Sequence, residues 1–191
     1  MRIGILGGSF NPVHNGHLEI ARNVLDSGIV ENIWLLPSSF HPLKNHSICL
    51  SFEQRLHLLK DAVAGLPQCF VFDYDNQGDA PSFTAVLLQK LENRFPEIEF
   101  YFIIGYDIIP ELNRWYNYPW LRDNARFIII NRPGNYDLSA ADFLKNKQFV
   151  EMAPQDISSS EIRELVTTGK SINGLVPPQV EQEIISLYHN T

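Results

Sequence analysis

The chain has 191 residues, of which 45% are hydrophobic and 19% charged, and its formal net charge is −7. This length suits one domain with a sizeable core, and the acidic balance argues against a broad nucleic-acid surface, which needs clustered Lys and Arg. No window approaches the roughly eighteen uninterrupted apolar residues of a membrane span, and no secretory signal pattern opens the sequence, so we expect a cytoplasmic protein.

Short apolar runs alternate with helical patterns along the chain. The clearest helix covers 51–65, because Ser51 and Gln54 have capping-box spacing and Gly65 ends the pattern. In chain order, the patterns predict a strand over 2–7, a helix over 18–28, a strand over 32–38, a helix over 51–65, a strand over 69–75, a helix over 82–95, strands over 99–105, 126–132 and 149–152, and helices over 158–169 and 178–190.

This alternation predicts an α/β fold: a single-domain, Rossmann-like, doubly wound parallel sheet followed by C-terminal helices. The apolar runs are continuous rather than alternating, which indicates strands that are buried on both faces. In such sheets, ligands bind beyond the carboxyl ends of the strands, near the point where the strand order reverses. The first candidates for function are therefore the segments that follow strands: 7–17, 37–44, 105–107 and 131–134.

The segment GGSFNPVHNGH, residues 7–17, follows the first predicted strand. It has neither the G-x-G-x-x-G spacing of a dinucleotide fingerprint nor the G-K-[ST] ending of a P-loop. Its glycines permit close approach to the backbone, and the helix behind it offers unpaired N–H groups to an anion. His14 and His17 share one helix face and could donate hydrogen bonds to phosphate oxygens. Alternatively, the glycines only form the turn and the histidines cap or pack; the pair beside two glycines favours the phosphate interpretation.

The histidines and cysteines give no sign of a structural metal site. Four histidines lie between residues 14 and 46, but no thiolate or carboxylate stands near them at familiar ligand spacing. Cys49 and Cys69 are too far apart for a C-x-x-C motif. We expect both cysteines to be reduced, although a disulfide between them is open.

Three segments together resemble a known family. Residues 7–17 resemble the G-x-F-x-P-x-H-x-G-H signature of the nucleotidyltransferase superfamily, and ISSSEIR, residues 157–163, resembles its second signature. Between them, 103–134 is similar to the middle of the bacterial nicotinate mononucleotide adenylyltransferases, with I-G-x-D, L-x-x-W and a strand closed by R-P-G. Two positions depart from the family pattern: Tyr106 replaces a small residue, and Ser160 replaces a common threonine.

The resemblance implies transfer of the adenylyl group of ATP to nicotinate mononucleotide, with release of pyrophosphate. The attacking phosphate oxygen is already ionised near neutral pH, so positioning and charge neutralisation suffice. Mg²⁺ is expected to arrive with ATP rather than in a protein cage. Three alternatives stay open: nicotinamide mononucleotide as substrate, phosphopantetheine as substrate, or a nucleotide-binding module without activity. A homo-oligomer is compatible with the sequence.

The resemblance also implies the roles of single residues. His17 would contact the α-phosphate in the transition state and Arg163 the β- and γ-phosphates. The catalytic candidates are His14, His17, Lys44 and Arg163. The ATP-binding candidates are Gly7, Gly8, Ser9, Phe10, Gly105, Asp107, Arg132, Ser158 and Ser159. The mononucleotide-binding candidates are Asn11, Thr84 and Trp115, the last by stacking on the pyridine ring.

Some of these residues have purely structural interpretations as well. Ser158 and Glu161 have capping-box spacing, so a helix cap explains Ser158 as well as a phosphate contact does. Asp107 could be the N-cap of a helix in IIPELN, residues 108–113, instead of binding ribose. Lys44 could instead be an ordinary surface lysine, and Thr84 a threonine in the first turn of a helix. Trp115 could be a core tryptophan.

Overall fold

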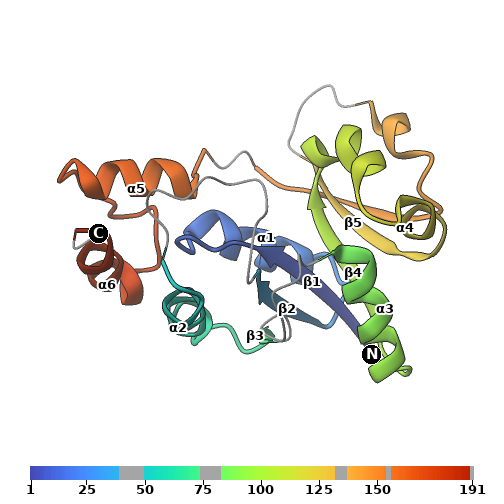
Figure 1. The fold of residues 1–191 in the computed structure, drawn as a ribbon, viewed down its shortest axis with the longest axis horizontal. Coiled ribbons are helices and arrows are strands. Elements are labelled where there is room, and N and C mark those ends of the chain that lie inside the picture. The colour runs from blue at the N-terminus through green and yellow to red at the C-terminus, as the bar shows by residue number, and fades with distance from the viewer. Residues whose placement is uncertain (39–49, 74–82, 132–136, 154–155, 190–191) are drawn as a thin grey trace.

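A computed structural model gives the fold (Figure 1) and describes residues 1–38, 50–73, 83–131, 137–153 and 156–189. Its parallel six-stranded sheet has the order β3-β2-β1-β4-β5-β6. The strands are β1 (Arg2–Gly8), β2 (Asn32–Pro37), β3 (Cys69–Val71), β4 (Glu99–Gly105), β5 (Arg126–Asn131) and β6 (Asn146–Glu151). The α-helices are α1 (Asn15–Asp26), α2 (Phe52–Val63), α3 (Thr84–Arg94), α4 (Tyr118–Asn124), α5 (Ser159–Thr167) and α6 (Pro178–His189), with 3₁₀ helices η1 (Tyr106–Arg114) and η2 (Leu138–Ala141).

The predicted α/β class and parallel sheet are confirmed, and each predicted strand and helix is present within a few residues of its expected bounds. The capping box is formed: the Gln54 N–H donates to Ser51 Oγ at 3.2 Å, and the Ser51 N–H donates to Gln54 Oε1 at 2.8 Å. The helices η1, α4 and η2 are the elements that the sequence patterns missed.

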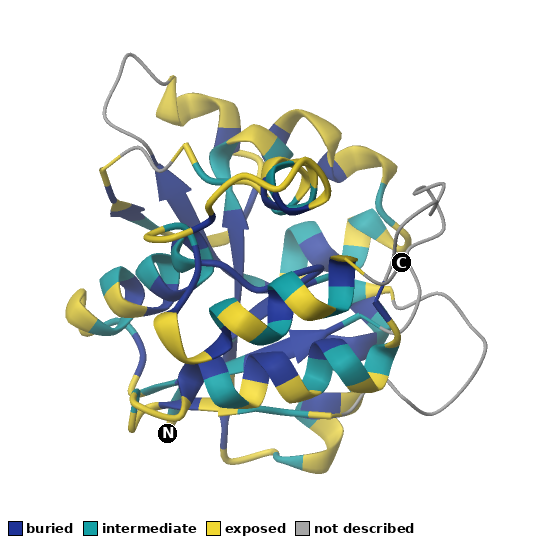
Figure 2. Cartoon of the chain, turned by 90° about the vertical axis from the view of Figure 1, so that its left-hand side faces the viewer, coloured by how far each residue is buried: buried dark blue, intermediate teal, exposed yellow. Residues whose placement is uncertain are grey.

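Side chains alternate between the two faces of the sheet and form two cores. Along β5, Ile128 and Ile130 belong to one core, whereas Phe127 and Ile129 belong to the other. Helices α1, α2, α5 and α6 contribute to the first core, and α3, η1 and α4 contribute to the second. The helices accordingly show buried stripes beside exposed ones (Figure 2). Burial on both faces explains why the strands appear in the sequence as continuous apolar runs.

The strand order reverses at β1, which pairs with β2 on one side and β4 on the other. The carboxyl ends of β1 and β4 therefore flank the switch point of the sheet. Helix α6 lies between α5 and α2 and contacts both (Figure 1). The Gln179 side chain at the start of α6 donates to the Ala62 carbonyl of α2 at 3.1 Å, which helps to hold the C-terminal helix there.

Two further expectations from the sequence concern the cysteines and membrane-spanning helices. Cys69 is a buried free cysteine, and burial raises the pKa of its thiol; Cys49 lies outside the described residues. Within the described ranges, no helix has both the length and the apolar character needed to cross a membrane.

Candidate functional site

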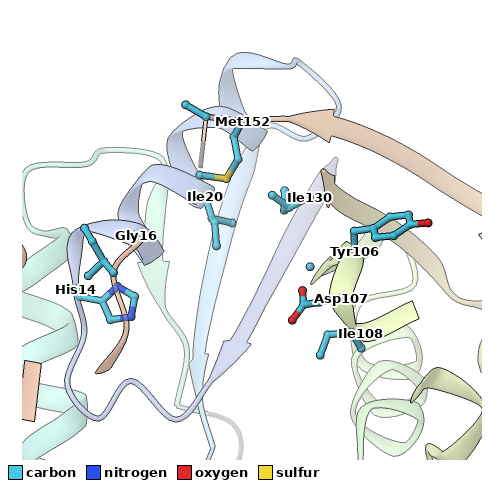
Figure 3. A pocket seen from close by; sticks show the side chains of 11 residues that line it. His14, Gly16, Ile20, Tyr106, Asp107, Ile108, Ile130 and Met152 are labelled. Carbon is cyan, nitrogen blue, oxygen red and sulfur yellow. The ribbon is translucent and has the colours of Figure 1, made fainter. Parts of the chain in front are cut away.

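A cavity of about 430 Å³ lies at the switch point of the sheet (Figure 3). His14 and Gly16 lie on one side of it, and Tyr106, Asp107 and Ile108 lie on the opposite side. The lining consists of His14, Gly16, Ile20, Gly105, Tyr106, Asp107, Ile108, Ile130, Met152, Ala153 and Ile157. His14, Gly105 and Asp107 are residues that the sequence nominated, and the cavity lies at the edge of the sheet where the sequence analysis looked for a site.

The two histidines of the opening segment stack on each other at the N-terminus of α1. Their ring centroids lie 3.7 Å apart with an interplanar angle of 27°. Burial lowers the pKa of His14 from its ordinary value of 6.5 to about 4. Burial, and secondarily the neighbouring His14, lowers the pKa of His17 well below 6.5. Both imidazoles are therefore neutral at physiological pH.

Hydrogen bonding fixes which nitrogen of His17 has the proton. The backbone N–H of His14 donates to Nδ1 of His17 at 3.2 Å, so Nδ1 must be the unprotonated nitrogen of the neutral ring. The proton is then on Nε2, where it can be donated to a ligand. Nδ1 of His14 is buried and has no hydrogen-bonding partner among the described residues. A buried polar atom without a partner is a candidate for a contact that the described residues do not supply.

Gly16 belongs to the site, although the sequence analysis did not nominate it. A Cβ at this position would lie 3.1 Å from His14 Nδ1 and 3.2 Å from His14 Cε1, which is tighter than ordinary van der Waals contact. The absent side chain therefore lets the His14 ring lie against the first turn of α1. The sequence signal that could have found it is the glycine of the H-x-G-H signature itself.

The backbone of the opening segment passes close to the core. Cβ atoms at Gly7 and Gly8 would lie 3.3 Å from Phe102 Cζ and 3.4 Å from Phe10 Cζ. Phe10 is buried, and its ring packs edge-on against His17 with centroids 4.8 Å apart. The Phe10 side chain is thus part of the hydrophobic core.

The second signature segment meets the first, although the two are far apart in the sequence. Ser159 Oγ donates to the Pro12 carbonyl at 3.0 Å, and Arg163 Nη1 donates to the Asn11 carbonyl at 2.7 Å. Ser158 is the N-cap of α5, since its Oγ accepts from the Glu161 N–H at 3.1 Å. The structural interpretation of Ser158 is thus confirmed.

On the other side of the cavity, Asp107 lies in the first turn of η1. The N-cap of η1 is Gly105, so the alternative that Asp107 caps this helix is wrong. A Cβ at Gly105 would overlap the Asp107 carboxylate in its observed position, so a larger residue at 105 would require the carboxylate to move. Tyr106 lines the cavity and its hydroxyl donates to the Asp137 carbonyl at 2.6 Å. This bond joins η1 to the start of η2.

The candidates for mononucleotide binding lie on different elements. Thr84 is the first residue of α3 and is half-buried. Trp115 follows η1, is also half-buried, and packs edge-on against Phe102 at 6.2 Å. Phe83 is 39% exposed, and its ring stacks on that of Tyr116 with centroids 4.6 Å apart. The contact between Phe83 and Tyr116 brings together the residues next to Thr84 and Trp115 in the sequence.

Asn11 is buried, and its side chain has protein partners. Its Oδ1 accepts from the Tyr188 hydroxyl at 2.6 Å and from the Leu50 N–H at 3.2 Å. Two other nominated residues, Lys44 and Arg132, lie outside the described residues, as does most of the segment 38–50 that follows β2. Elsewhere in the described chain, His57, Asp61 and the half-buried Glu183 form a group between α2 and α6.

Comparison with known proteins identifies the family. The model of a family described as cytidylyltransferase-like matches residues 5–165. The chain belongs to this family. The match includes both signature segments, the carboxyl-terminal part of β1 and the other five strands of the sheet.

Individual relatives agree with this assignment. The chain is 37% identical to a probable nicotinate-nucleotide adenylyltransferase of Geobacillus kaustophilus, over 94% of this chain and 81% of that protein. It is 34% identical to a protein of the same name from Geotalea daltonii, over 96% of this chain and 95% of the relative. The fold is similar to that of a Plasmodium falciparum nicotinic acid mononucleotide adenylyltransferase complexed with NaAD, with a TM-score of 0.86 and 23% identity over 100% of this chain and 98% of that one.

Proposed function

We propose that this chain transfers the adenylyl group of ATP to nicotinate mononucleotide, giving nicotinate adenine dinucleotide and pyrophosphate in NAD biosynthesis. The observation that supports this most directly is the meeting of the two signature segments, through Ser159 and Arg163, beside a neutral histidine pair at the switch-point cavity. The named relatives with 37% and 34% identity support the same reaction.

The chemistry needs no activated side chain. The 5′-phosphate oxygen of the mononucleotide is ionised near neutral pH and attacks the α-phosphorus of ATP, and the bond to the pyrophosphate oxygen breaks. The Nε2–H of His17 is the donor that we assign to the α-phosphate, where negative charge shifts as the reaction proceeds. A fixed neutral donor at that point stabilises the transition state more than the ground state.

Positive charge for the triphosphate comes from other groups. We assign Arg163 to the β- and γ-phosphates, and its forked donors suit polyphosphate oxygens. We also assign Lys44, which follows β2 in the sequence, to neutralising charge on the phosphates. Asp107 is the one carboxylate in the described cavity lining, so the described residues fit an Mg²⁺ ion that enters with ATP rather than one held in a protein cage. When bound, that ion would neutralise charge on the phosphate oxygens.

The N-terminus of α3 supports nicotinate over nicotinamide. Phe83 is the N-cap residue of this 11-residue helix and provides no side-chain hydrogen bond to it. The first N–H groups of a helix and its dipole favour an anion, so a carboxylate near Thr84 gains more than a neutral amide does. Trp115 would stack on the pyridine ring of the same substrate.

A substrate comparison tests this proposal. ATP and Mg²⁺ are mixed with the protein and with equal concentrations of nicotinate mononucleotide, nicotinamide mononucleotide or phosphopantetheine, and pyrophosphate release is measured. We expect the highest kcat/KM with nicotinate mononucleotide. A higher value with nicotinamide mononucleotide would overturn the argument from α3, and a higher value with phosphopantetheine would overturn the assigned reaction. The absence of turnover with all three would favour a nucleotide-binding module without activity.

A further inference from the structure

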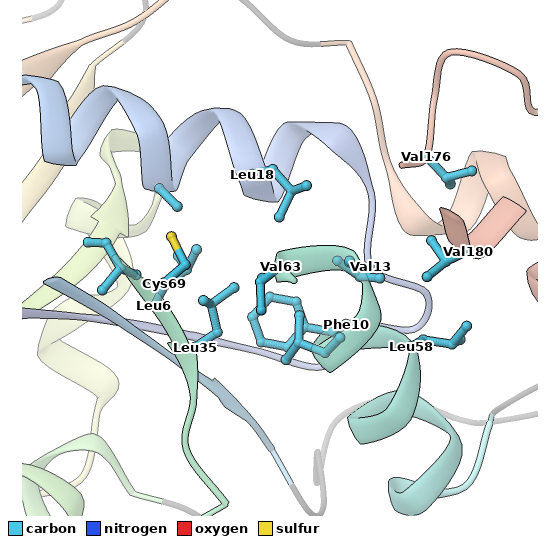
Figure 4. Packing of buried hydrophobic residues seen from close by; sticks show 14 of the residues in the cluster. Leu6, Phe10, Val13, Leu18, Leu35, Leu58, Val63, Cys69, Val176 and Val180 are labelled. Carbon is cyan, nitrogen blue, oxygen red and sulfur yellow. The ribbon is translucent and has the colours of Figure 1, made fainter. Parts of the chain in front are cut away.

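Phe10, in the middle of the opening segment, has an unfavourable backbone conformation. Its φ is +44°, in the left-handed region that residues other than glycine rarely adopt. Figure 4 shows its ring in the core beside Leu35 and Val63. Such a conformation persists only where the surroundings hold it firmly. The backbone on both sides of Phe10 is held in this way, by polar side chains that are themselves buried.

Arg55 of α2 holds the residue before Phe10. Its side chain is only 5% exposed. Nη1 donates to the Ser9 carbonyl at 2.6 Å, and Nε donates to the Leu50 carbonyl at 3.3 Å. A guanidinium is always charged, and burying it is costly unless its donors are satisfied. An apolar side chain would fill this place at a lower desolvation cost, so the charge indicates a role beyond packing.

Tyr188 of α6 holds the residue after Phe10. Tyr188 is 2% exposed and Asn11 is 6% exposed, and the tyrosine hydroxyl donates to Asn11 Oδ1 at 2.6 Å. The same oxygen accepts from the Leu50 N–H at 3.2 Å. Leu50 is thus bonded to both Arg55 and Asn11, and the three side chains form one connected buried network around Phe10.

We infer that Arg55, Asn11 and Tyr188 form a positioning clamp for the segment that binds the phosphates, and that the C-terminal helix α6 is thereby needed for efficient adenylyl transfer. None of the three needs to touch substrate through its side chain. The clamp fixes the backbone at Ser9 and Asn11, and the Asn11 carbonyl in turn receives Arg163 at 2.7 Å. Displacements of about 1 Å in such a site reduce rates by about a hundredfold. This inference rests on the proposed function.

The test compares two substitutions in the same helix. Tyr188→Phe removes the bond to Asn11 and keeps the ring, whereas Ile184→Val removes one buried methylene from α6 and leaves the clamp intact. At a temperature where both variants are folded, we expect kcat to fall about tenfold in Tyr188→Phe, with each KM changed less than about twofold. Ile184→Val should keep the kcat of the unsubstituted protein. Arg55→Lys keeps the positive charge, but a lysine cannot donate to the Ser9 and Leu50 carbonyls in the same geometry. Its kcat should fall about as far as that of Tyr188→Phe.

A second readout does not depend on turnover. Backbone amide hydrogen exchange over residues 8–13 should be faster in Tyr188→Phe than in the unsubstituted protein, and unchanged in Ile184→Val. Unchanged kcat and unchanged exchange in Tyr188→Phe would overturn the clamp, as would equal kcat losses in the two α6 variants. If the unsubstituted protein fails to use nicotinate mononucleotide, the proposed function is wrong, but the exchange experiment still decides whether the clamp holds the segment.

Discussion

The low pKa of His14 predicts a loss of stability in mild acid. The ring is 7% exposed, and burial lowers its pKa from 6.5 to about 4 in the folded chain. Between these two values the unfolded chain binds the proton and the folded chain does not, so stability falls as the pH falls through this window. Because one pKa unit is worth about 1.4 kcal/mol, the whole effect is about 3 kcal/mol, of which about 2 kcal/mol is lost by pH 5.

The substitution His14→Asn isolates this contribution. Asparagine does not titrate and is a favourable residue at the start of a helix, where His14 is the N-cap of α1. The free energy of unfolding is measured by urea titration at pH 7.5 and at pH 5.0 for both proteins. We expect the unsubstituted protein to lose about 2 kcal/mol more than the variant over this interval. Equal losses would refute the reasoning, because His14 would then titrate alike in the folded and unfolded chains.

Three substitutions test the site itself. His17→Ala should lower kcat by about 10²–10³-fold while ATP affinity changes little, and a matching loss of affinity would make His17 an ordinary binding residue. Trp115→Ala should raise KM for the mononucleotide about tenfold, and an unchanged KM would exclude stacking. Gly16→Ala should lower kcat about tenfold by displacing His14, whereas Gly65→Ala, where an added Cβ would meet nothing within 4 Å, should leave kcat unchanged.

The sheet could be predicted because its strands are buried on both faces. A short, continuous apolar run such as 99–105 is typical of a central strand, and the observed β4 has the same bounds. The stretch 106–124 gave no comparable signal. Its helices η1 and α4 are short, Pro110 lies inside the first, and Asn117 with φ +53° interrupts the chain before the second. Too few turns are present for a helical period to emerge.

The site residues that could be predicted are those that lie in short, contiguous sequence motifs. His14 and His17 were found because their spacing alone places them on one helix face at the end of β1. Arg55 and Tyr188 were not found, because their importance depends on contacts with residues 46 and 177 positions away in the sequence. On sequence alone both are ordinary members of amphipathic helices, and only the tertiary structure shows that their polar atoms face inward.

In the proposed reaction, the neutrality of the histidines explains how the site can bind a polyanion and still release it. Two protonated imidazoles would attract the triphosphate and the pyrophosphate product alike, which strengthens binding without lowering the barrier. Burial instead keeps both rings neutral, and the contact from the His14 backbone to His17 Nδ1 leaves a single directed donor on Nε2. Permanent charge is then left to Arg163, whose guanidinium is fixed on the Asn11 carbonyl. In the proposed reaction, the groups that hold permanent charge are thus separate from His17, the group assigned to the phosphorus under attack.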